Sequence, residues 1–375
     1  MAKSEIKKTD KFYSLDRIKS TNCEWNLIYG MRSNGKSYAI KKEVLEDFRD
    51  NGHQLIYLRR YDMETKPSEV VGYFRDMCVP NKFGKVAIKE IFGEKAKTID
   101  MRRKEIRLLF DDEEVEPVVL GYAVPLSGQS HECGQAYPLV GNIIYEEFIS
   151  RDSGMIAYLK NEPSKLMDFV STVSRDRNIK VYLLGNTISR FCPYFSEWEL
   201  TKTPSQKAGE IVVYHINSGR TDDDGNPIVI NLAVEHTEVM KTKNKMMFGH
   251  STSMITEGGW QSEVKPHLEN KLEDYTVLHL FVLDVSSYKF LCRYLWDKST
   301  NNVFWYVERK TTDIKEATRI VSNKYTNSPL WTPTLSGLSH DEEVAFRSIK
   351  LGKVVYSDNL TGTEFKQALG QLGVM

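Results

Sequence analysis

The sequence lacks the features that mark secreted, membrane-spanning and disordered proteins. Its five cysteines are scattered and form no Cys-x-x-Cys pair, which argues against a disulfide framework and favours a reducing compartment. No run approaches about 18 apolar residues, so we expect no membrane-spanning helix. The segment MAKSEIKKTD has no apolar stretch behind its lysines and does not resemble a secretory signal. With 27% charged and 41% apolar residues, the composition is that of a folded chain.

The sequence also has no excess of positive charge, because 51 Lys and Arg residues balance 51 Asp and Glu residues. Proteins that bind nucleic acid tightly and statically usually carry a basic excess, since neutralising phosphates releases counterions. Any contact with nucleic acid is therefore expected to come from local patches, or to be weak and repeated. The length of 375 residues predicts two or three domains.

The N-terminal part alternates strands and helices. Residues 24–29 predict a strand, and a helix with apolar residues at Ile40, Val44 and Phe48 follows from Ser37 until Asn51-Gly52. A strand at 55–58 completes a parallel βαβ unit. Further on, the pattern predicts a hairpin over 98–126 that turns at 111–114, strands at 142–145, 179–184, 210–215 and 228–234, and a helix with the apolar stripe Leu166, Met167, Phe169, Val170 and Val173.

After about residue 235 the character of the sequence changes. Residues 236–272 are polar and predict a helical or irregular connector. Three antiparallel strands are expected at 277–283, 288–296 and 303–307, and a short strand at 354–356. The helical signals are an apolar stripe at Ile314, Ala317, Ile320 and Val321 and two capping boxes, Ser339 with Glu342 and Thr361 with Glu364. Together they predict a second α/β unit.

Residues 30–37, Gly-Met-Arg-Ser-Asn-Gly-Lys-Ser, match the phosphate-loop pattern G-x-x-x-x-G-K-[ST] between a strand and a helix. The glycines let backbone N–H groups point at phosphate oxygens, and the helix N-terminus adds partial positive charge. We expect Lys36 to contact the β- and γ-phosphates of ATP and Ser37 to ligate Mg²⁺. An ordinary glycine-containing turn is the alternative. The predicted nucleotide-binding residues are Gly30, Arg32, Ser33, Asn34, Gly35, Lys36 and Ser37.

Two carboxylates follow a buried strand and are expected to complete the magnesium site. Such sites usually present Asp and then Glu, the first for Mg²⁺ and the second to polarise the attacking water. Here Glu146 stands where Asp is usual, and its extra methylene moves the carboxylate by about a bond length. Glu147 is the expected catalytic base. The alternative is that the pair is a solvated strand end.

Three further polar residues are candidates for the same site. Arg175 and Arg177 follow a helix, and either is placed to act as an arginine finger on a neighbouring subunit's γ-phosphate or to compensate the helix C-terminal dipole. Asn186 ends a strand and would sense the γ-phosphate or cap a turn. Two other patterns are weak. His131, Glu132 and Cys133 lack the second half of a zinc site, and Met246-Met247-Phe248 is more typical of packing.

The segments from Trp25 to Lys42, Ile143 to Phe148 and Val181 to Asn186 together resemble one family. These are the DNA-packaging (encapsidation) ATPases of small short-tailed phages with protein-primed linear genomes, which are related to the large terminases. The resemblance implies an α/β chain with an ASCE-type P-loop ATPase domain (residues 1–234), a linker domain (235–270) and an RNase H-like domain (271–375).

The resemblance also implies how such a protein works. Family members form a homopentameric ring at the portal of an empty procapsid in the host cytoplasm and use ATP to push double-stranded DNA inside, in some cases with a structural RNA. On this basis Lys36 and Ser37 contact phosphate and Mg²⁺, Glu146 and Glu147 serve the metal and the water, and Arg175 is the expected finger. Glutamate at 146 in place of aspartate leaves its metal role open.

In the C-terminal unit, nuclease chemistry would need several carboxylates converging on two metal ions. The strand expected at 276–283 carries none, and Asp284 comes only at its end, so we interpret the nuclease as lost. Lys289, Arg293 and Lys298 are candidate phosphate contacts, or a solvated face. The overall interpretation is an ATP-driven DNA translocase. A P-loop helicase, a nucleotide kinase and a nucleotide-controlled capsid- or RNA-binding assembly factor are the alternatives.

Overall fold

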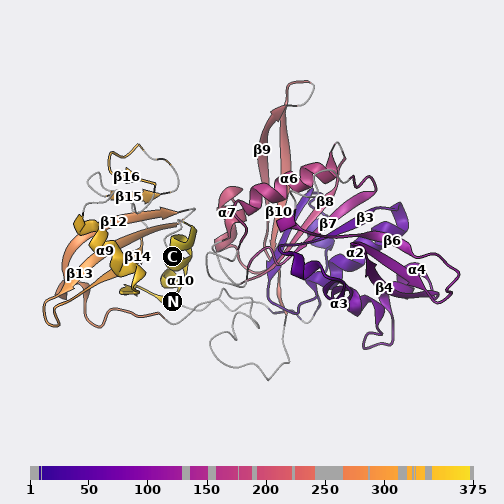
Figure 1. Cartoon of the computed structure of the whole chain (residues 1–375), viewed down its shortest axis with the longest axis horizontal. Coiled ribbons are helices and arrows are strands. Elements are labelled where there is room, and N and C mark those ends of the chain that lie inside the picture. The colour runs from indigo at the N-terminus through magenta and orange to yellow at the C-terminus, as the bar shows by residue number, and fades with distance from the viewer. Residues whose placement is uncertain are drawn as a thin grey trace.

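The structure is a computed structural model that describes residues 8–9, 11–128, 136–150, 158–175, 177–187, 192–221, 224–240, 265–285, 288–310, 319–322, 325, 327–333 and 340–371. The described chain builds two units, each on its own β-sheet (Figure 1). The weak metal and packing patterns at 131–133 and 246–248 lie outside the described residues. Within them, no helix is long and apolar enough to cross a membrane.

The N-terminal sheet is parallel at its centre. As far as the structure describes the chain, it has nine strands in the order β4-β5-β6-β3-β7-β8-β2-β10-β9. Six neighbouring strands at the centre of the sheet run parallel: β6, β3, β7, β8, β2 and β10. Antiparallel strands flank them on both sides. The bounds are β2 Trp25–Gly30, β3 Gln54–Arg59, β4 Ala96–Arg102, β5 Glu105–Phe110, β6 Val118–Pro125, β7 Val140–Glu146, β8 Lys180–Asn186, β9 Ile211–Thr221 and β10 Pro227–His236.

Helices cover both faces of this sheet, which is why its central strands are apolar runs. In β2, Leu27 packs in one core cluster and Ile28 in the other. The Ile28 side is covered by α1 (Asp16–Lys19), α2 (Lys36–Asn51), α3 (Pro67–Cys78) and α4 (Ala87–Phe92). The Leu27 side is covered by α6 (Glu162–Ser174) and α7 (Pro193–Glu197). The 3₁₀ turns are η1 (Asp62–Thr65), η2 (Leu126–Gly128), η3 (Thr203–Ser205) and η4 (Leu272–Asp274).

The C-terminal sheet mixes antiparallel and parallel strand pairs. Its described strands are ordered β16-β15-β12-β13-β14-β17. Strands β12, β13 and β14 form an antiparallel meander, and β15 pairs parallel with β12. The bounds are β12 Thr276–Val285, β13 Tyr288–Asp297, β14 Asn302–Arg309, β15 Arg319–Ser322, β16 Trp331–Thr332, β17 Val354–Tyr356, α9 His340–Lys350 and α10 Asn359–Gln371. Trp305 and Phe346 stack in its core.

Near the end of the N-terminal unit, two short strands bring distant segments together. β1 (Lys8–Thr9) pairs parallel with β11 (Val239–Met240), which follows β10. Thr237, just before β11, donates its backbone N–H to the carbonyl of Tyr29 at the end of β2 (2.8 Å). The segment that leaves the N-terminal sheet therefore lies directly beside the phosphate loop.

Most predicted elements of the N-terminal unit are confirmed, but two predictions are wrong. The predicted turn at 111–114 is confirmed, since it joins the antiparallel strands β5 and β6. The single strand expected before it is wrong, because Arg103 and Lys104 adopt left-handed φ of 49° and 71° and turn β4 into β5. No Gly or Asn signals that turn. In α6, Met167 is 42% exposed and does not belong to the buried stripe, whereas Leu166 and Phe169 do.

Two helical predictions in the C-terminal unit are also wrong. Ile320 and Val321 lie in β15 and not on a helix, because β12 offers them a parallel partner, while positions 314 and 317 lie outside the described residues. Thr361 does not cap α10. The helix begins at Asn359, and Asp358 accepts the N–H of Thr361 (2.8 Å). Position 339 of the other box lies outside the described residues.

Candidate nucleotide site

The loop between β2 and α2 has the backbone of an anion-binding turn. Gly35 caps α2 with φ of 95°, and Ser33 has φ of 58°, so both lie in the left-handed region. Glycine reaches such angles without strain. Gly30 has no room for a side chain, since a Cβ there would lie 2.1 Å from Thr237 Oγ1. Both glycines of the motif are therefore required by the fold, and the loop forms a concavity of N–H groups at a helix N-terminus.

Lys36 is buried beneath this loop, with 6% of its surface exposed. Its Nζ donates to the carbonyl oxygen of Met31 (2.7 Å) and to Oδ1 of Asn34 (3.2 Å). Burial lowers the pKa of Lys36 from 10.5 to about 8, although the charge of Glu146 opposes this shift. A buried ammonium with a lowered pKa gains from an anionic partner, and a phosphate chain is such a partner.

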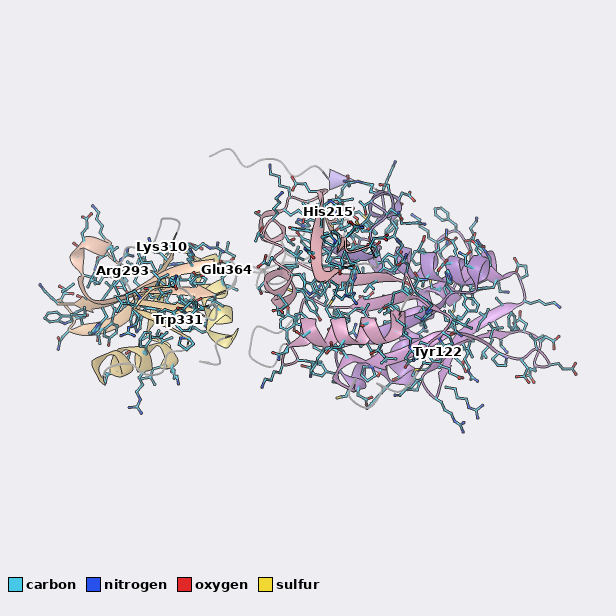
Figure 2. All side chains as sticks on the ribbon, turned by 90° about the horizontal axis from the view of Figure 1, so that it is seen from above. Tyr122, His215, Arg293, Lys310, Trp331 and Glu364 are labelled. Carbon is cyan, nitrogen blue, oxygen red and sulfur yellow. The ribbon has the colours of Figure 1, made fainter. Side chains whose placement is uncertain are left out.

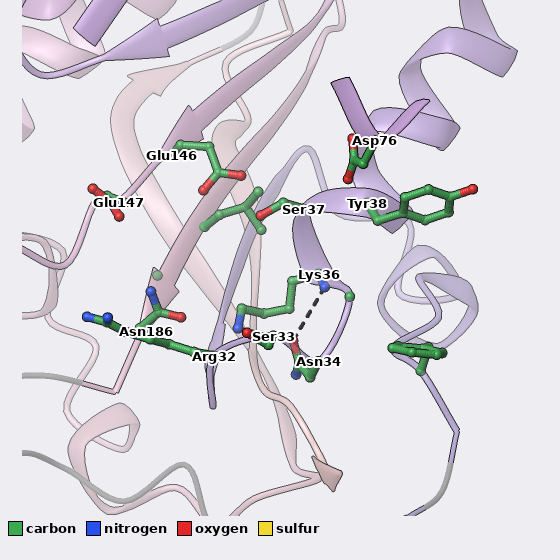
Figure 3. A pocket seen from close by; sticks show the side chains of 14 residues that line it. Arg32, Ser33, Asn34, Lys36, Ser37, Tyr38, Asp76, Glu146, Glu147 and Asn186 are labelled. Atoms are coloured by element: carbon green, nitrogen blue, oxygen red, sulfur yellow. Dashed lines mark hydrogen bonds between the residues drawn. The ribbon is translucent and has the colours of Figure 1, made fainter. Parts of the chain in front are cut away.

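The loop opens into a cavity of about 440 Å³ at the carboxyl ends of β7 and β8 (Figure 3). In an open parallel sheet this edge is where ligands bind. Every predicted nucleotide-binding residue except Gly30 lines the cavity, and so do Glu146, Glu147 and Asn186. The structure thus brings together the residues that the sequence separates by more than a hundred positions.

Glu146 ends β7 and is 9% exposed. Its Oε1 accepts a hydrogen bond from the hydroxyl of Tyr73 in α3 (2.9 Å), which orients the carboxylate. Burial and the charge of Glu146 both raise the pKa of Tyr73, so the phenol stays a donor. Glu146 and Ser37 face the same cavity, and their hard oxygen atoms are ligands that suit Mg²⁺. The donor set therefore fits a magnesium ion bound with phosphate.

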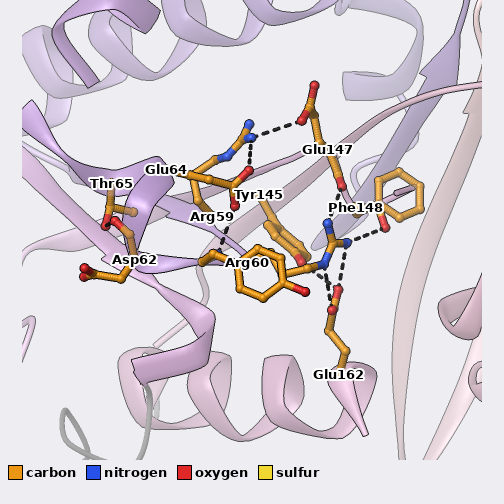
Figure 4. A network of polar contacts seen from close by, with 10 residues as sticks. Arg59, Arg60, Asp62, Glu64, Thr65, Tyr145, Glu147, Phe148 and Glu162 are labelled. Carbon is orange, nitrogen blue, oxygen red and sulfur yellow. Dashed lines mark hydrogen bonds and ion pairs between the residues drawn. The ribbon is translucent and has the colours of Figure 1, made fainter. Parts of the chain in front are cut away.

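Glu147 follows the strand with a left-handed φ of 60°. Its Oε2 accepts a hydrogen bond from Nη2 of Arg59, which ends the adjacent strand β3 (3.0 Å). Arg59 also donates to Oε1 of Glu64 (2.5 Å). These contacts, drawn in Figure 4, fix the Glu147 carboxylate, and Glu147 lines the cavity. Residue 147 is therefore not a freely solvated strand end.

The predicted arginines fall into two different environments, both away from the cavity. The Arg177 guanidinium donates to the carbonyls of Tyr137, Pro138, Val140 and Val173, so Arg177 has a structural role within its own chain. Arg175 is exposed at the C-cap of α6. It precedes β8, whose carboxyl end carries Asn186, so Arg175 lies at the opposite edge of the sheet from the cavity.

The cavity also includes residues that no sequence pattern indicated. Phe12, Tyr38 and Asp76 line it. Phe12 is 63% exposed and is held beside the loop because the N–H of Tyr13 donates to the carbonyl of Asn34 (2.9 Å). None of the three belongs to a motif. For Arg59 there was a weak signal, a basic pair at the end of a predicted strand.

The chain matches the model of a known protein family. A family model described as Podovirus DNA encapsidation protein (Gp16) matches residues 6–351. The chain belongs to this family. The match covers the whole N-terminal sheet and every strand of the C-terminal sheet except β17, so the Gp16 family assignment includes most of the C-terminal unit as well as the phosphate loop.

Curated relatives and solved structures extend the comparison. The DNA packaging proteins of Bacillus phages B103 and phi29 are 34% and 33% identical to the chain over 173 and 196 residues, which is 45% and 52% of this chain. The matches cover 46% and 50% of those proteins, so the chain spans about half the length of these relatives. The structure described as the bacteriophage Phi-29 viral genome packaging motor assembly matches 95% of this chain and 99% of its own, with a TM-score of 0.54 and 20% identity. It supports the fold.

The three candidate phosphate contacts of the C-terminal unit interact with other side chains of the same unit. Arg293 pairs with Glu308 (2.8 Å), and Lys289 lies 3.8 Å from Asp284. Figure 2 shows Arg293 within this unit. Lys298 lies over the ring of Trp296 (5.8 Å). Contrary to the sequence prediction, Asp284 lies inside β12, which runs to Val285.

Proposed function

We propose that this Gp16 family protein is an ATP-driven motor that moves double-stranded DNA into a procapsid. The observation that carries the proposal is that Lys36, Ser37, Glu146 and Glu147 line one cavity in a chain of the encapsidation family. The names of the Bacillus phage relatives, DNA packaging proteins, support the same function. The structure of the phage Phi-29 packaging motor assembly supplies the matching fold.

In the proposed reaction, the loop N–H groups and Lys36 bind the β- and γ-phosphates of ATP. Ser37 and Glu146 would hold Mg²⁺, which neutralises charge on the phosphates. Glu147 orients the attacking water and accepts its proton as the γ-phosphoryl group leaves. Asn186, at the end of β8, is placed to donate a hydrogen bond to the γ-phosphate or to the water. Arg32 from the loop adds positive charge to the same space.

Arg175 can act in catalysis only within a homo-oligomeric ring. Its exposed side chain lies at the opposite edge of the sheet from its own cavity, so it serves catalysis only if that edge meets a neighbour's cavity. A ring of identical subunits, a pentamer in our proposal, provides this contact. Arg177 is unsuited to the role because its guanidinium donates to four carbonyls of its own chain.

We propose that the chain has an ATPase domain, a linker and an RNase H-like domain without nuclease activity, and we extend the first domain from 234 to Met240 because β10 and β11 pair with its strands. In β12, Asp284 pairs in register with Ser322 of β15, so the neighbouring strand offers a hydroxyl where a second metal-binding carboxylate would be needed. We propose that this domain contacts DNA, the portal or a structural RNA, and that the protein acts in the host cytoplasm at the portal vertex.

ATP turnover tests this proposal against its alternatives. We expect the rate of the purified protein to rise when double-stranded DNA and portal-bearing procapsids are both present. Turnover that ignores both additions, combined with nucleotide-dependent binding to capsid or RNA, would indicate an assembly factor instead. ATP-dependent strand separation on a forked duplex would indicate a helicase.

A further inference from the structure

Arg60, the residue directly after β3, is buried in an ion pair. It is 5% exposed, and its partner Glu162, the first residue of α6, is fully buried. The guanidinium donates Nε to Oε2 (2.8 Å) and Nη2 to Oε1 (3.0 Å) of Glu162, which is a bidentate pair. The ring of Tyr158 lies 4.9 Å from the guanidinium carbon.

Both oxygen atoms of the buried Glu162 carboxylate accept several hydrogen bonds. Besides Arg60, the hydroxyls of Tyr145 (2.6 Å) and Tyr194 (2.8 Å) donate to Oε1, and the N–H of Leu159 donates to Oε2 (2.8 Å). Burial and the charge of Glu162 both raise the pKa values of the two phenols, which keeps them protonated as donors. Because the carboxylate and its donors are all hydrogen-bonded, this network holds the Arg60 guanidinium in one orientation.

The remaining N–H groups of Arg60 reach the loop that carries the proposed catalytic base. Nη1 donates to the carbonyl of Glu147 (3.3 Å) and Nη2 to the carbonyl of Phe148 (3.1 Å), as Figure 4 shows. The backbone N–H of Phe148 donates in turn to the carbonyl of Leu184 in β8 (3.1 Å). Glu147 lies between these fixed points in the left-handed region, a conformation that costs a non-glycine residue free energy.

We propose that Arg60 is a positioning residue for ATP hydrolysis: its guanidinium, fixed by Glu162, holds the backbone of residues 147–148 so that the Glu147 carboxylate faces the nucleotide cavity. Arg60 does not line that cavity, in contrast to Glu147. It therefore acts on the base and not on the bound nucleotide. This inference rests on the proposed role of Glu147 in hydrolysis.

The test uses Arg60→Lys, which keeps a positive charge for Glu162 but lacks the fork that reaches both carbonyls. We expect kcat for ATP to fall about 10- to 100-fold, while KM and the Kd for nucleotide stay within about twofold. In the Glu147→Gln background the same change should lower turnover no further, because both substitutions act on the same group, the Glu147 carboxylate. Arg107→Lys is the matched control, since Arg107 forms a bidentate pair with Asp100 (3.1 and 2.7 Å) and lies outside the cavity.

Three outcomes separate this inference from the proposed function. Unchanged kcat in Arg60→Lys, or a loss equal to that of Arg107→Lys, overturns the positioning role even if Glu147→Gln is inactive. A further loss in the Glu147→Gln background also overturns it, because Arg60 would then act elsewhere. If Arg60→Lys behaves as expected but DNA and procapsids leave ATP turnover unchanged, the positioning role stands and the motor function is contradicted.

Discussion

Arg59 and Glu147 form an ion pair between adjacent strands, with Nη2 of Arg59 lying 3.0 Å from Oε2 of Glu147. The proposed base is thus oriented by a strand other than its own. Arg59 is in turn held by Glu64 of η1. The orientation of Glu147 therefore depends on one distant segment, residues 59–64, which holds the side chain through Arg59 and the backbone through Arg60.

Glu147→Gln should separate nucleotide binding from hydrolysis. Glutamine retains an oxygen that accepts the hydrogen bond from Arg59 but has no carboxylate to take a proton. We expect the Kd for ATP to stay within about twofold and single-turnover hydrolysis to fall by about 10²- to 10⁴-fold. Glu64→Gln is the control, since Glu64 also pairs with Arg59 but does not line the cavity. Near-normal hydrolysis by Glu147→Gln would remove Glu147 from the role of base.

Nucleotide affinity should depend on pH through Lys36, whose pKa burial lowers to about 8. Phosphate favours the charged ammonium, so binding must add a proton to Lys36 once the pH exceeds about 8. The Kd for ADP should then rise by up to about tenfold per pH unit, and calorimetry should show proton uptake. Lys36→Arg, which remains charged, should abolish this pH dependence. If the Kd of the wild type does not change with pH either, Lys36 does not bind phosphate in this way.

The lowered pKa of Lys36 also makes the free energy of unfolding depend on pH. Between about pH 8 and the ordinary value of 10.5, the unfolded chain holds more protons at Lys36 than the folded chain does. The contribution of Lys36 to the free energy of unfolding therefore rises with pH in this window and is lowest below about pH 8. Saturating nucleotide should cancel that rise, which can be measured as a difference in denaturation midpoints.

Phe12 should contribute to binding the base of ATP. Its exposed ring lines the cavity beside Gly35 and is held there by the Tyr13–Asn34 bond. Stacking of an aromatic pair contributes about 0.5–1.5 kcal/mol, so Phe12→Ala should weaken ATP binding about 2- to 10-fold. Binding of inorganic triphosphate should not change. Phe83→Ala is a matched control, because Phe83 is also exposed but does not line the cavity; equal losses in both variants would argue against stacking.

Arg175 should act on a neighbouring subunit. We expect Arg175→Ala to suppress ATP turnover only in assembled rings and to leave the nucleotide Kd of the monomer unchanged. Mixing Arg175→Ala with Glu147→Gln subunits should restore some activity, since some interfaces then pair an intact Glu147 with an intact Arg175. Arg177→Ala should instead lower the thermal midpoint, because four carbonyls lose their donor. A complete lack of complementation would count against Arg175 as the finger.

The central part of the site could be predicted because its signals are local or follow from parallel-sheet geometry. The loop from Gly30 to Ser37 is a contiguous motif whose glycines are required at their own positions. Glu146 and Asn186 each end an apolar strand, and parallel strands present their carboxyl ends at one edge. The placement of these residues in one cavity therefore followed from the sequence.

The rest depends on contacts that no local pattern records. Arg103 and Lys104 make a tight turn without the usual turn residues, and Ile320 and Val321 form a strand because β12 lies beside them. Phe12 joins the cavity only through the fold of the chain before α1. The Arg60–Glu162 pair joins residues 102 positions apart, and only the structure shows it beneath Glu147.

The most direct measurement is the amount of double-stranded DNA that portal-bearing procapsids protect from nuclease when they are mixed with this protein. We expect protection that requires ATP and Mg²⁺, that is lost with Lys36→Ala and that is lost with Glu147→Gln despite normal nucleotide binding. Equal protection without ATP, or with Lys36→Ala, would contradict the claim that the nucleotide in this cavity drives DNA movement.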